Sequence, residues 1–532
     1  MRNLFLLLFW VSSLGWAQED ARVYFTDKPN VQAYFDAPLT MLTQRALDRR
    51  IQQNIPLSID DVPVDANYIE TISNVPGITY KAQSKWMNCI HVRGSVADIQ
   101  GLASFPFVER IVFANPQLNA KSTPQGPTAQ PKTMALQTTY SYGNAQNQVT
   151  MLNTHLLHQQ NHAGAGKIIA VLDSGFQGVD TAPPFQSLFN QNRYLGGYNY
   201  VSQSTNVFDL HHHGTLVLSS MAAVTDGTLV GTAPTASYYL FITEDVMEEN
   251  PVEESYWVQA AEEADRLGCD IISSSLGYYG YDNPAYSYTY SNLTGNQAFA
   301  SQGANKAFSK GMVVVVSAGN SGNSTAPYVA VPAEATHALA IGAVDSMEFR
   351  ASFSSIGPTF DGRVKPDLMA RGVGAAVCTP QGDFTYVSGT SLSCPLISGS
   401  IACFWAAAPQ LTNQQVVDLV KQSADRFTNP TMEYGYGVPD FAAALSNALS
   451  LATWATSSVK VYPNPFYNEV TFQVDFTGAT TLKLFNALGQ LVRETRLTPN
   501  QATVDVADFP AGWYTYLLQE GTQTITGKLI KP

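Results

Sequence analysis

Three motifs in the middle of the chain supply a carboxylate, an imidazole and a hydroxyl that could act in one reaction. Asp173 ends an apolar run, His213 closes a row of three histidines and precedes Gly-Thr, and Ser391 lies in Gly-Thr-Ser. Histidine is the natural general base near neutral pH. A serine hydroxyl becomes a nucleophile when such a base lies beside it. These residue types therefore predict attack by a serine on a carbonyl carbon.

Each motif also has a simpler interpretation. Asp173 could cap a turn, Ser391 could cap a helix, and the histidines at 211–213 could bind a metal ion. Consecutive residues do not face one way on a helix or a strand, so proton transfer by one histidine is favoured over metal binding. It is the combination of the three motifs that points to catalysis.

The elements around these residues predict how they are positioned. Apolar runs before Asp173 and Asn320 indicate buried strands, and the carboxyl ends of parallel strands form the sites of α/β sheets. There the Asn320 amide could point at an oxyanion. Ser391 opens a run of small and apolar residues with Pro395 in its first turn, which predicts a buried helix. The positive end of that helix favours a developing negative charge.

With these motifs, residues 145–450 resemble the subtilisin-like serine proteases, in which Asp, His and Ser follow one another in this order. The resemblance assigns the triad to Asp173, His213 and Ser391, and the oxyanion hole to Asn320. It implies a three-layer α/β domain with a mainly parallel sheet. It also implies a serine endopeptidase that forms an acyl-enzyme without a cofactor. A structural calcium ion is compatible with the family, but no metal ligand can be assigned.

A further block of the resemblance concerns the substrate. Ser275, Leu276 and Gly277 match the segment that pairs with the substrate backbone, so we expect a peptide to bind there as an added strand. The chain departs from the usual family pattern at Leu216, where a second histidine is common, and at 392–394, which replace Met and Ala residues. Neither departure removes a catalytic group.

Two other functional classes compete with a protease. A surface adhesin could keep the fold and lack activity, although all four catalytic side chains are present. An esterase of the α/β-hydrolase type would need a G-x-S-x-G motif and the order Ser, Asp, His. Ser391 lies instead in Gly-Thr-Ser, and it comes last.

Composition narrows the class of partner. The chain has 532 residues, a net charge of −13 and only 13% charged residues, and it lacks a dense basic run. Nucleic acid is therefore excluded as a partner, because neutralising phosphates needs basic clusters. The five cysteines are too few for a disulfide scaffold, and none forms a C-x-x-C pair.

The N-terminal residues predict secretion and a zymogen. Residues 1–17 have a basic start, a short apolar stretch and small residues before Gln18, as a signal peptide does. A membrane anchor is the alternative, but the stretch is shorter than the roughly 20 apolar residues of a spanning helix. Residues 18–120, with strands near 24–25, 90–92 and 108–113 and a helix over 37–51, sit where secreted subtilisin-like enzymes carry a propeptide. A permanent accessory domain is the alternative.

Two boundaries separate the protease domain, at 141–450, from its neighbours. Residues 121–140 are rich in Pro, Thr, Gln and Ala without apolar periodicity, which predicts a linker in which activation cleavage occurs. Residues 456–532 alternate apolar and polar positions, as at Val470, Phe472 and Val474, which predicts a small all-β sandwich.

The C-terminal module carries three blocks with a resemblance of their own. Val461-Tyr-Pro-Asn-Pro465, the block at 484–490 and Pro510-Ala-Gly-Trp-Tyr514 resemble the C-terminal sorting domain of the type IX secretion system of Bacteroidetes. The resemblance implies export across the inner and outer membranes, with the secretion machinery as partner, to the medium or the outer cell surface. A carbohydrate-binding sandwich is the alternative.

Two further stretches have several interpretations. Six tyrosines between 278 and 290 could form a plain surface loop or line the cleft rim. The acidic run from Glu244 to Glu254 contains Asn250-Pro251, which predicts a helix start, and calcium binding is the weaker alternative.

Overall fold

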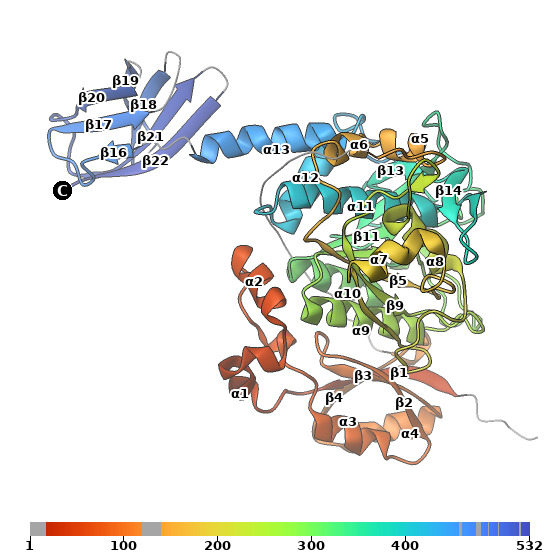
Figure 1. Cartoon of the computed structure of the whole chain (residues 1–532). Coiled ribbons are helices and arrows are strands. Elements are labelled where there is room, and N and C mark those ends of the chain that lie inside the picture. Colours follow the sequence, from red (N-terminus) through yellow and green to blue (C-terminus); the bar gives the residue numbers. More distant parts are fainter. Residues whose placement is uncertain are drawn as a thin grey trace, which may run out of the picture. The chain divides into compact units, whose positions relative to one another are not determined.

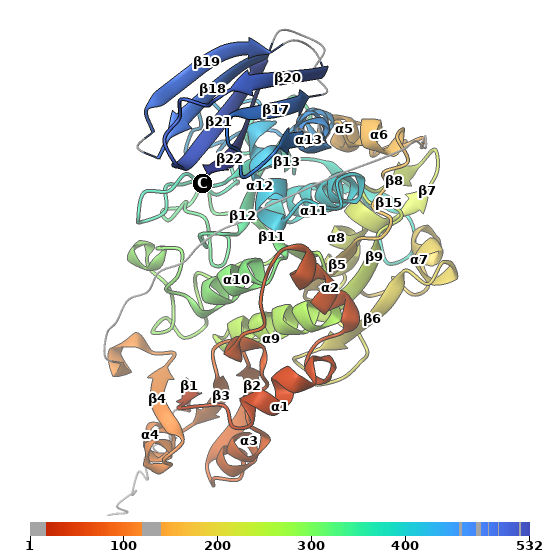
Figure 2. The same cartoon turned by 90° about the vertical axis from the view of Figure 1, so that its left-hand side faces the viewer.

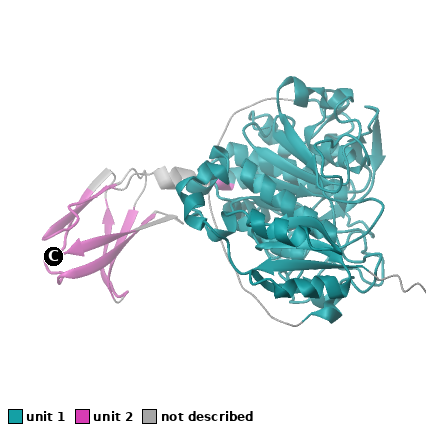
Figure 3. Cartoon of the chain, turned by 90° about the horizontal axis from the view of Figure 1, so that it is seen from below, with its two compact units in different colours: residues 1–446 teal, residues 447–532 magenta. Residues whose placement is uncertain are grey.

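The computed structural model describes residues 18–119, 140–456, 460–474, 480–487, 489–497, 500–520 and 523–532. The predicted signal peptide and all but the last residue of the predicted linker lie outside the described residues. The chain divides into two compact units, Met1–Ser446 and Asn447–Pro532 (Figure 3).

The first unit begins with an α+β domain built on an antiparallel sheet of strand order β2-β3-β1-β4. Apolar side chains of the strands and of helices α3 and α4, such as Val23, Ile72 and Ile99, form its core. The three predicted strands fall within β1, β3 and β4. The bounds are β1 (Glu19–Phe25), α3 (Ala66–Ser73), β2 (Ile78–Ser84), β3 (Cys89–Gly94), α4 (Val96–Gly101) and β4 (Val108–Phe113).

A helical segment, residues 26–65, joins β1 to α3, and we call it the arm. The continuous helix predicted over 37–51 is wrong, because the arm contains α1 (Val31–Asp36), a 3₁₀ turn from Pro38 and α2 (Gln44–Gln52). Proline has no N–H to continue a helix. The Oγ of Thr43 then accepts the N–H of Ala46 at 3.3 Å, which caps α2.

The larger domain of the first unit is organised by a parallel sheet of strand order β13-β12-β11-β10-β5-β9-β6. Its central strands are fully buried and read as continuous apolar runs, as expected of parallel strands covered on both faces. The bounds are β5 (Ile168–Asp173), β6 (Tyr194–Asn199), β9 (Ser237–Ile242), β10 (Ile271–Ser274), β11 (Val313–Ser317), β12 (Leu339–Val344) and β13 (Leu368–Arg371).

Helices cover both faces of this sheet, with α8 and α11 on one side and α9 and α10 on the other (Figure 1). The expected three-layer α/β domain is thus observed. The helices of the domain are α5 (Gln146–Thr150), α6 (Thr154–His158), α7 (Gln186–Asn190), α8 (His213–Ala222), α9 (Val252–Leu267), α10 (Phe299–Ser309), α11 (Thr390–Ala407) and α12 (Asn413–Gln422). Helix α13 (Phe441–Thr456) begins in the first unit and ends in the second. Two hairpins complete the domain, β7 (Val224–Thr225) with β8 (Leu229–Val230), and β14 (Ala375–Cys378) with β15 (Phe384–Val387).

One helix in the described part of the chain, α11, is long and apolar enough to cross a membrane. It is also 94% buried inside the domain, where it packs against α8 and the strands β10 to β13. Its apolar surface therefore belongs to the core of the domain.

The second unit contains two antiparallel sheets, of strand order β16-β17-β20 and β19-β18-β21-β22. Phe472 and Val504 from one sheet and Leu484 and Leu518 from the other belong to a single core, so the predicted sandwich is observed. The bounds are β16 (Lys460–Tyr462), β17 (Glu469–Val474), β18 (Thr480–Asn486), β19 (Leu491–Leu497), β20 (Asn500–Asp505), β21 (Gly512–Glu520) and β22 (Gln523–Lys531).

Candidate active site

The carboxyl edge of the parallel sheet brings the first two predicted residues into contact. Asp173 is the last residue of β5 and is fully buried, while His213 is the first residue of α8. The Nδ1 atom of His213 lies 2.7 Å from Oδ1 of Asp173, and the His213 side chain is 29% exposed. The carboxylate raises the pKa of His213 above its ordinary value, because it stabilises the imidazolium. The pair can hold one proton on Nδ1 and leave Nε2 free to accept another.

A second histidine of the row supports the turn before α8. The Nδ1 atom of His211 accepts the backbone N–H of His213 at 3.3 Å and lies 3.1 Å from Oγ of Ser174. Burial lowers the pKa of His211, which favours the neutral, accepting form. Among the residues described, no group of three or more His, Cys, Asp or Glu side chains could hold a metal ion.

Asn320 follows β11, and Thr390 orients its side-chain amide. Its Oδ1 accepts the backbone N–H of Thr390 at 2.9 Å and the Thr390 hydroxyl at 3.1 Å. A backbone N–H can only donate, so the atom that faces it must be the amide oxygen. The Nδ2 donor of Asn320 is consequently left free of Thr390.

Gly389 shows that the Asn320 donor and the Ser391 hydroxyl border the same small space. A Cβ at position 389 would lie 3.0 Å from Oγ of Ser391 and 3.9 Å from Nδ2 of Asn320. A side chain there would therefore crowd both groups. The glycine of the Gly-Thr-Ser motif leaves this space unfilled.

The start of α11 differs in one respect from the prediction. The helix begins at Thr390, so Pro395 is its sixth residue and lies beyond the first turn. Because proline has no N–H, the carbonyl of Ser391 loses the helical donor four residues ahead. The hydroxyl of Ser275 donates to that carbonyl instead, at 2.8 Å. Ser275 thereby ties the end of β10 to the proposed nucleophile.

Helix α8, which begins with His213, packs against helix α11, which carries Ser391. Leu216 of α8 and Leu392 of α11 belong to one buried cluster with Ala375 and Val377. Both leucines are departures from the usual family pattern, and here they fill core space. No hydrogen bond joins His213 to Ser391 in the described structure. Such bonds are often long before substrate binds.

The segment after β10 offers an exposed backbone edge. Ser275 is buried, Leu276 is half-buried and Gly277 is exposed, while Tyr278 exchanges backbone hydrogen bonds with Val331 at 2.7 and 3.1 Å. The peptide groups of Gly277 make no backbone hydrogen bond within the described part of the chain. This edge has the unpaired donors and acceptors that an added strand requires.

Glu244, the first residue of the acidic run, lies at the edge of the site, a position that the sequence analysis did not predict. It follows β9, which pairs with β5 in the register Asp173–Ile242, so it emerges at the same sheet edge as Asp173. Its Oε1 accepts the hydroxyls of Tyr278 at 2.7 Å and Thr243 at 2.9 Å. Burial raises the pKa of Glu244 to about 7. Its position two residues after an apolar strand is the signal that could have identified it.

The tyrosine-rich stretch is an irregular surface loop, as the sequence favoured, but its tyrosines point inward, since Tyr278, Tyr281 and Tyr286 are buried and the other three are half-buried. The hydroxyls of Tyr281 and Tyr288 donate to Oε1 of Glu254 at 3.0 and 2.7 Å. The predicted helix start is confirmed, since α9 begins at Val252 and the N–H of Asn250 donates to the Glu253 carboxylate at 3.1 Å.

Comparison with protein families matches three consecutive parts of the chain. Residues 164–438 match the subtilase family, residues 20–130 match the peptidase S8 propeptide domain of Bacteroidota, and residues 460–532 match the secretion system C-terminal sorting domain. These matches confirm the protease, propeptide and sorting-domain resemblances. The sorting domain implies export and a cell-surface or secreted location.

Curated relatives agree with the central match. Subtilisin NAT of Bacillus subtilis subsp. natto is 31% identical over 300 residues, which are 56% of this chain and 70% of that protein. Subtilisin of Bacillus pumilus is 30% identical over 300 residues, which are 56% of this chain and 97% of that protein. The chain therefore belongs to the subtilase family of serine peptidases and is the zymogen of a secreted member.

Proposed function

We propose that this protein is an endopeptidase in which Asp173, His213 and Ser391 form the catalytic triad. The observation that carries the proposal is the 2.7 Å contact of Asp173 with His213 at the sheet edge that Asn320 and the start of α11 also reach. Nε2 of His213 takes the proton of the Ser391 hydroxyl as Oγ attacks the peptide carbonyl. The Asp173 carboxylate holds the His213 tautomer and stabilises the imidazolium.

The tetrahedral oxyanion receives hydrogen bonds from Nδ2 of Asn320 and from the backbone N–H of Ser391. Its collapse breaks the C–N bond, and His213 returns the proton to the leaving amine. The acyl group stays on Ser391 as an ester. Water then attacks that ester while His213 accepts its proton, which releases the carboxylate product and restores the hydroxyl. Every step uses groups of the chain itself, so no cofactor is required, and a structural calcium ion has no assigned site.

The proposal also assigns roles in export, inhibition and substrate binding to the other parts of the chain. Residues 1–17 direct passage of the inner membrane, and residues 456–532 engage the type IX machinery for passage of the outer membrane. Residues 18–120 inhibit the enzyme, and the linker at 121–140 is cut during activation. Ser275, Leu276 and Gly277 hold the substrate as an added strand.

Replacing Ser391 with alanine tests the triad. We expect the Ser391→Ala enzyme to fold and to lose turnover and labelling by a fluorophosphonate. Ser388→Ala is the matched control, because this exposed serine only accepts the backbone N–H of Gly374 at 3.0 Å. Retained peptide hydrolysis in purified Ser391→Ala protein would refute the assignment. Absence of turnover and labelling in the unaltered, processed enzyme would instead favour an inactive adhesin.

A further inference from the structure

The arm of the propeptide contacts the protease domain at a place remote from the active site. Helix α2 lies beside α9 (Figure 2), and its side chains reach the segments that lead into β5 and β10. Asp173 is the last residue of β5 and Ser275 directly follows β10, so both lie at the opposite edge of the sheet. The six residues of β5 separate the two edges of the sheet by roughly 20 Å, at about 3.3 Å per residue.

Arginines of α2 bind the C-terminal end of α9. Arg49 contacts the carboxylate of Asp265 at 2.5 Å and donates to the carbonyl of Cys269. Arg45 donates to the carbonyl of Gly268 at 2.9 Å. A helix C-terminus carries partial negative charge and free carbonyl groups. With Asp265 added, this surface has the charge and the acceptors that guanidinium groups fit.

The central ion pairs of this contact are buried. The side chains of Arg49 and Arg50 are 5% and 2% exposed, and Asp265 is fully buried. Arg50 donates to Asp265 at 2.7 Å and to Asp61 of the arm at 2.8 Å. Within the described residues, all the cations paired with Asp265 belong to the propeptide, namely Arg49, Arg50 and Lys85. Removing one of these cations while the arm stays bound leaves a buried carboxylate short of a partner, which is costly.

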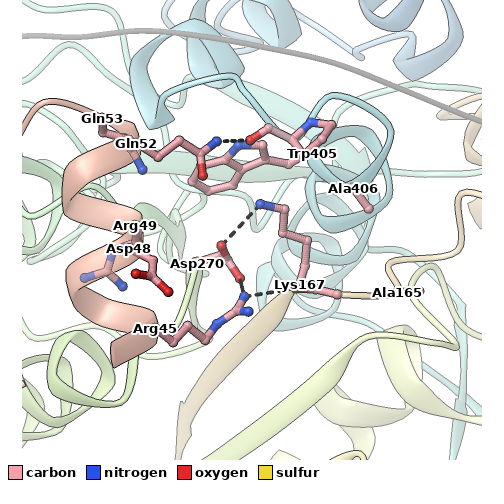
Figure 4. A pocket seen from close by; sticks show the side chains of 12 residues that line it. Arg45, Asp48, Arg49, Gln52, Gln53, Ala165, Lys167, Asp270, Trp405 and Ala406 are labelled. Atoms are coloured by element: carbon pink, nitrogen blue, oxygen red, sulfur yellow. Dashed lines mark hydrogen bonds and ion pairs between the residues drawn. The ribbon is translucent and has the colours of Figure 1, made fainter. Parts of the chain in front are cut away.

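Asp270, a neighbouring carboxylate, differs from Asp265 in having a cation of the protease beside it. Figure 4 shows Arg45 and Lys167 on either side of Asp270, and Lys167 of the protease itself lies 3.2 Å from that carboxylate. Asp270 therefore keeps a cation when the whole propeptide leaves, whereas the described cations paired with Asp265 all leave with the propeptide. A reverse pair, in which Lys306 of the protease contacts Asp60 of the arm at 2.8 Å, strengthens the same interface.

The β-sheet domain of the propeptide already binds α9, because the Ser84 hydroxyl and the backbone N–H of Trp86 donate to the Glu262 carboxylate at 2.6 and 2.9 Å. We propose that the arm is a second anchor beside this contact, an arginine-bearing helix seated on the end of α9, which slows dissociation of the cut propeptide from the protease. The proposal rests on the zymogen function stated above. Cutting the linker then leaves the inhibitor bound, and release requires the arm to leave Asp265 as a separate event.

The experiment uses the full chain with Ser391→Ala, which stops self-cleavage. A recognition sequence for a site-specific protease is inserted within 121–139, the folded protein is cut there, and dissociation of the propeptide from the immobilised protease is timed. We expect Arg49→Met to dissociate at least about 30-fold faster than the unaltered arm, as for the loss of one partner of a buried charge pair. Arg110→Met is the control, because Arg110 pairs with Glu109 inside the propeptide, and its rate should stay within about twofold.

Equal dissociation rates for Arg49→Met and the unaltered arm would overturn the anchor. If Arg49→Met does not fold, hydrogen exchange on the unaltered cut complex decides, because protection of Gln44–Gln52 must persist after the cut. Loss of that protection while the rest of the propeptide stays bound would also overturn it. Both readouts measure binding, so they are separate from the proposed triad, which is tested by peptide hydrolysis and fluorophosphonate labelling.

Discussion

Replacing Asn320 with alanine removes the proposed oxyanion donor and leaves the nucleophile and base in place. Two hydrogen bonds from Thr390 hold the amide before any substrate arrives, so the donor costs little reorganisation during the reaction. Loss of one such donor typically lowers kcat by about 10²–10³-fold, or about 2.7–4 kcal/mol. The bond forms chiefly with the transition state, so KM should change less than about twofold. Steady-state kinetics of the processed enzyme on a chromogenic peptide measure both constants.

Two variants serve as controls for this change. Asn320→Asp keeps acceptors for Thr390 but replaces the donor with an oxygen, so kcat should fall at least as far as in Asn320→Ala. Thr390→Val removes the 3.1 Å hydroxyl contact and keeps the 2.9 Å backbone contact, so we expect a loss of about 10-fold or less. A decrease in kcat of less than about 3-fold in Asn320→Ala, or a rise in KM alone, would refute the oxyanion role.

Three other predictions concern charge and burial. The proposed base is neutral His213, and Asp173 raises the pKa of its imidazole, so kcat/KM should fall as pH drops through a value above 6.5. In Asp173→Asn, the acidic limb of the pH profile of the residual activity should move to lower pH. An acidic limb that does not move would contradict the pairing. The Lys365 and Lys421 ammonium groups, at 2.7 and 2.5 Å, overcome burial to hold the pKa of Asp367 at about 2, below the unfolded value of 3.8. Its contribution to stability is thus present above pH 3.8 and lost as pH falls through about 2. Asp367→Ala should lower the free energy of unfolding by about 3–5 kcal/mol, and an unchanged urea midpoint would contradict this. All five cysteines are free and buried, so a thiol reagent should react with none before unfolding; rapid labelling of native protein would show exposure that the structure lacks.

The strands and the positions of the candidate site residues could be predicted because local sequence carries the signal. A fully buried parallel strand reads as a continuous apolar run, and Asp173 and Asn320 come directly after such runs. The helix after Gly389 was likewise visible as a row of small and apolar residues. The role of the Ser275 hydroxyl was not visible, because it depends on the carbonyl that Pro395 leaves without a donor.

Contacts between distant segments could not be predicted from one sequence. Arg49 and Asp265 are 216 positions apart, and nothing in either local pattern connects them. The tyrosines around 281 read as a polar loop because their partner, Glu254, lies at the start of a helix elsewhere in the chain. In the arm, residues 37–51 have helical composition, and only the proline at 38 and the cap at 43 indicate two separate elements.

The residues proposed for catalysis lie at the carboxyl edge of the parallel sheet, whereas the arm binds at its amino edge. β5 is fully buried along its whole length, so the arm can leave its amino end without rearranging Asp173 at its carboxyl end. An anchor at one edge raises the effective concentration of the inhibitory segment at the other, and short links reach millimolar values. On this proposal the arginine contacts with Asp265 prolong inhibition after cleavage, and they do so at the sheet edge opposite the residues proposed to carry out hydrolysis.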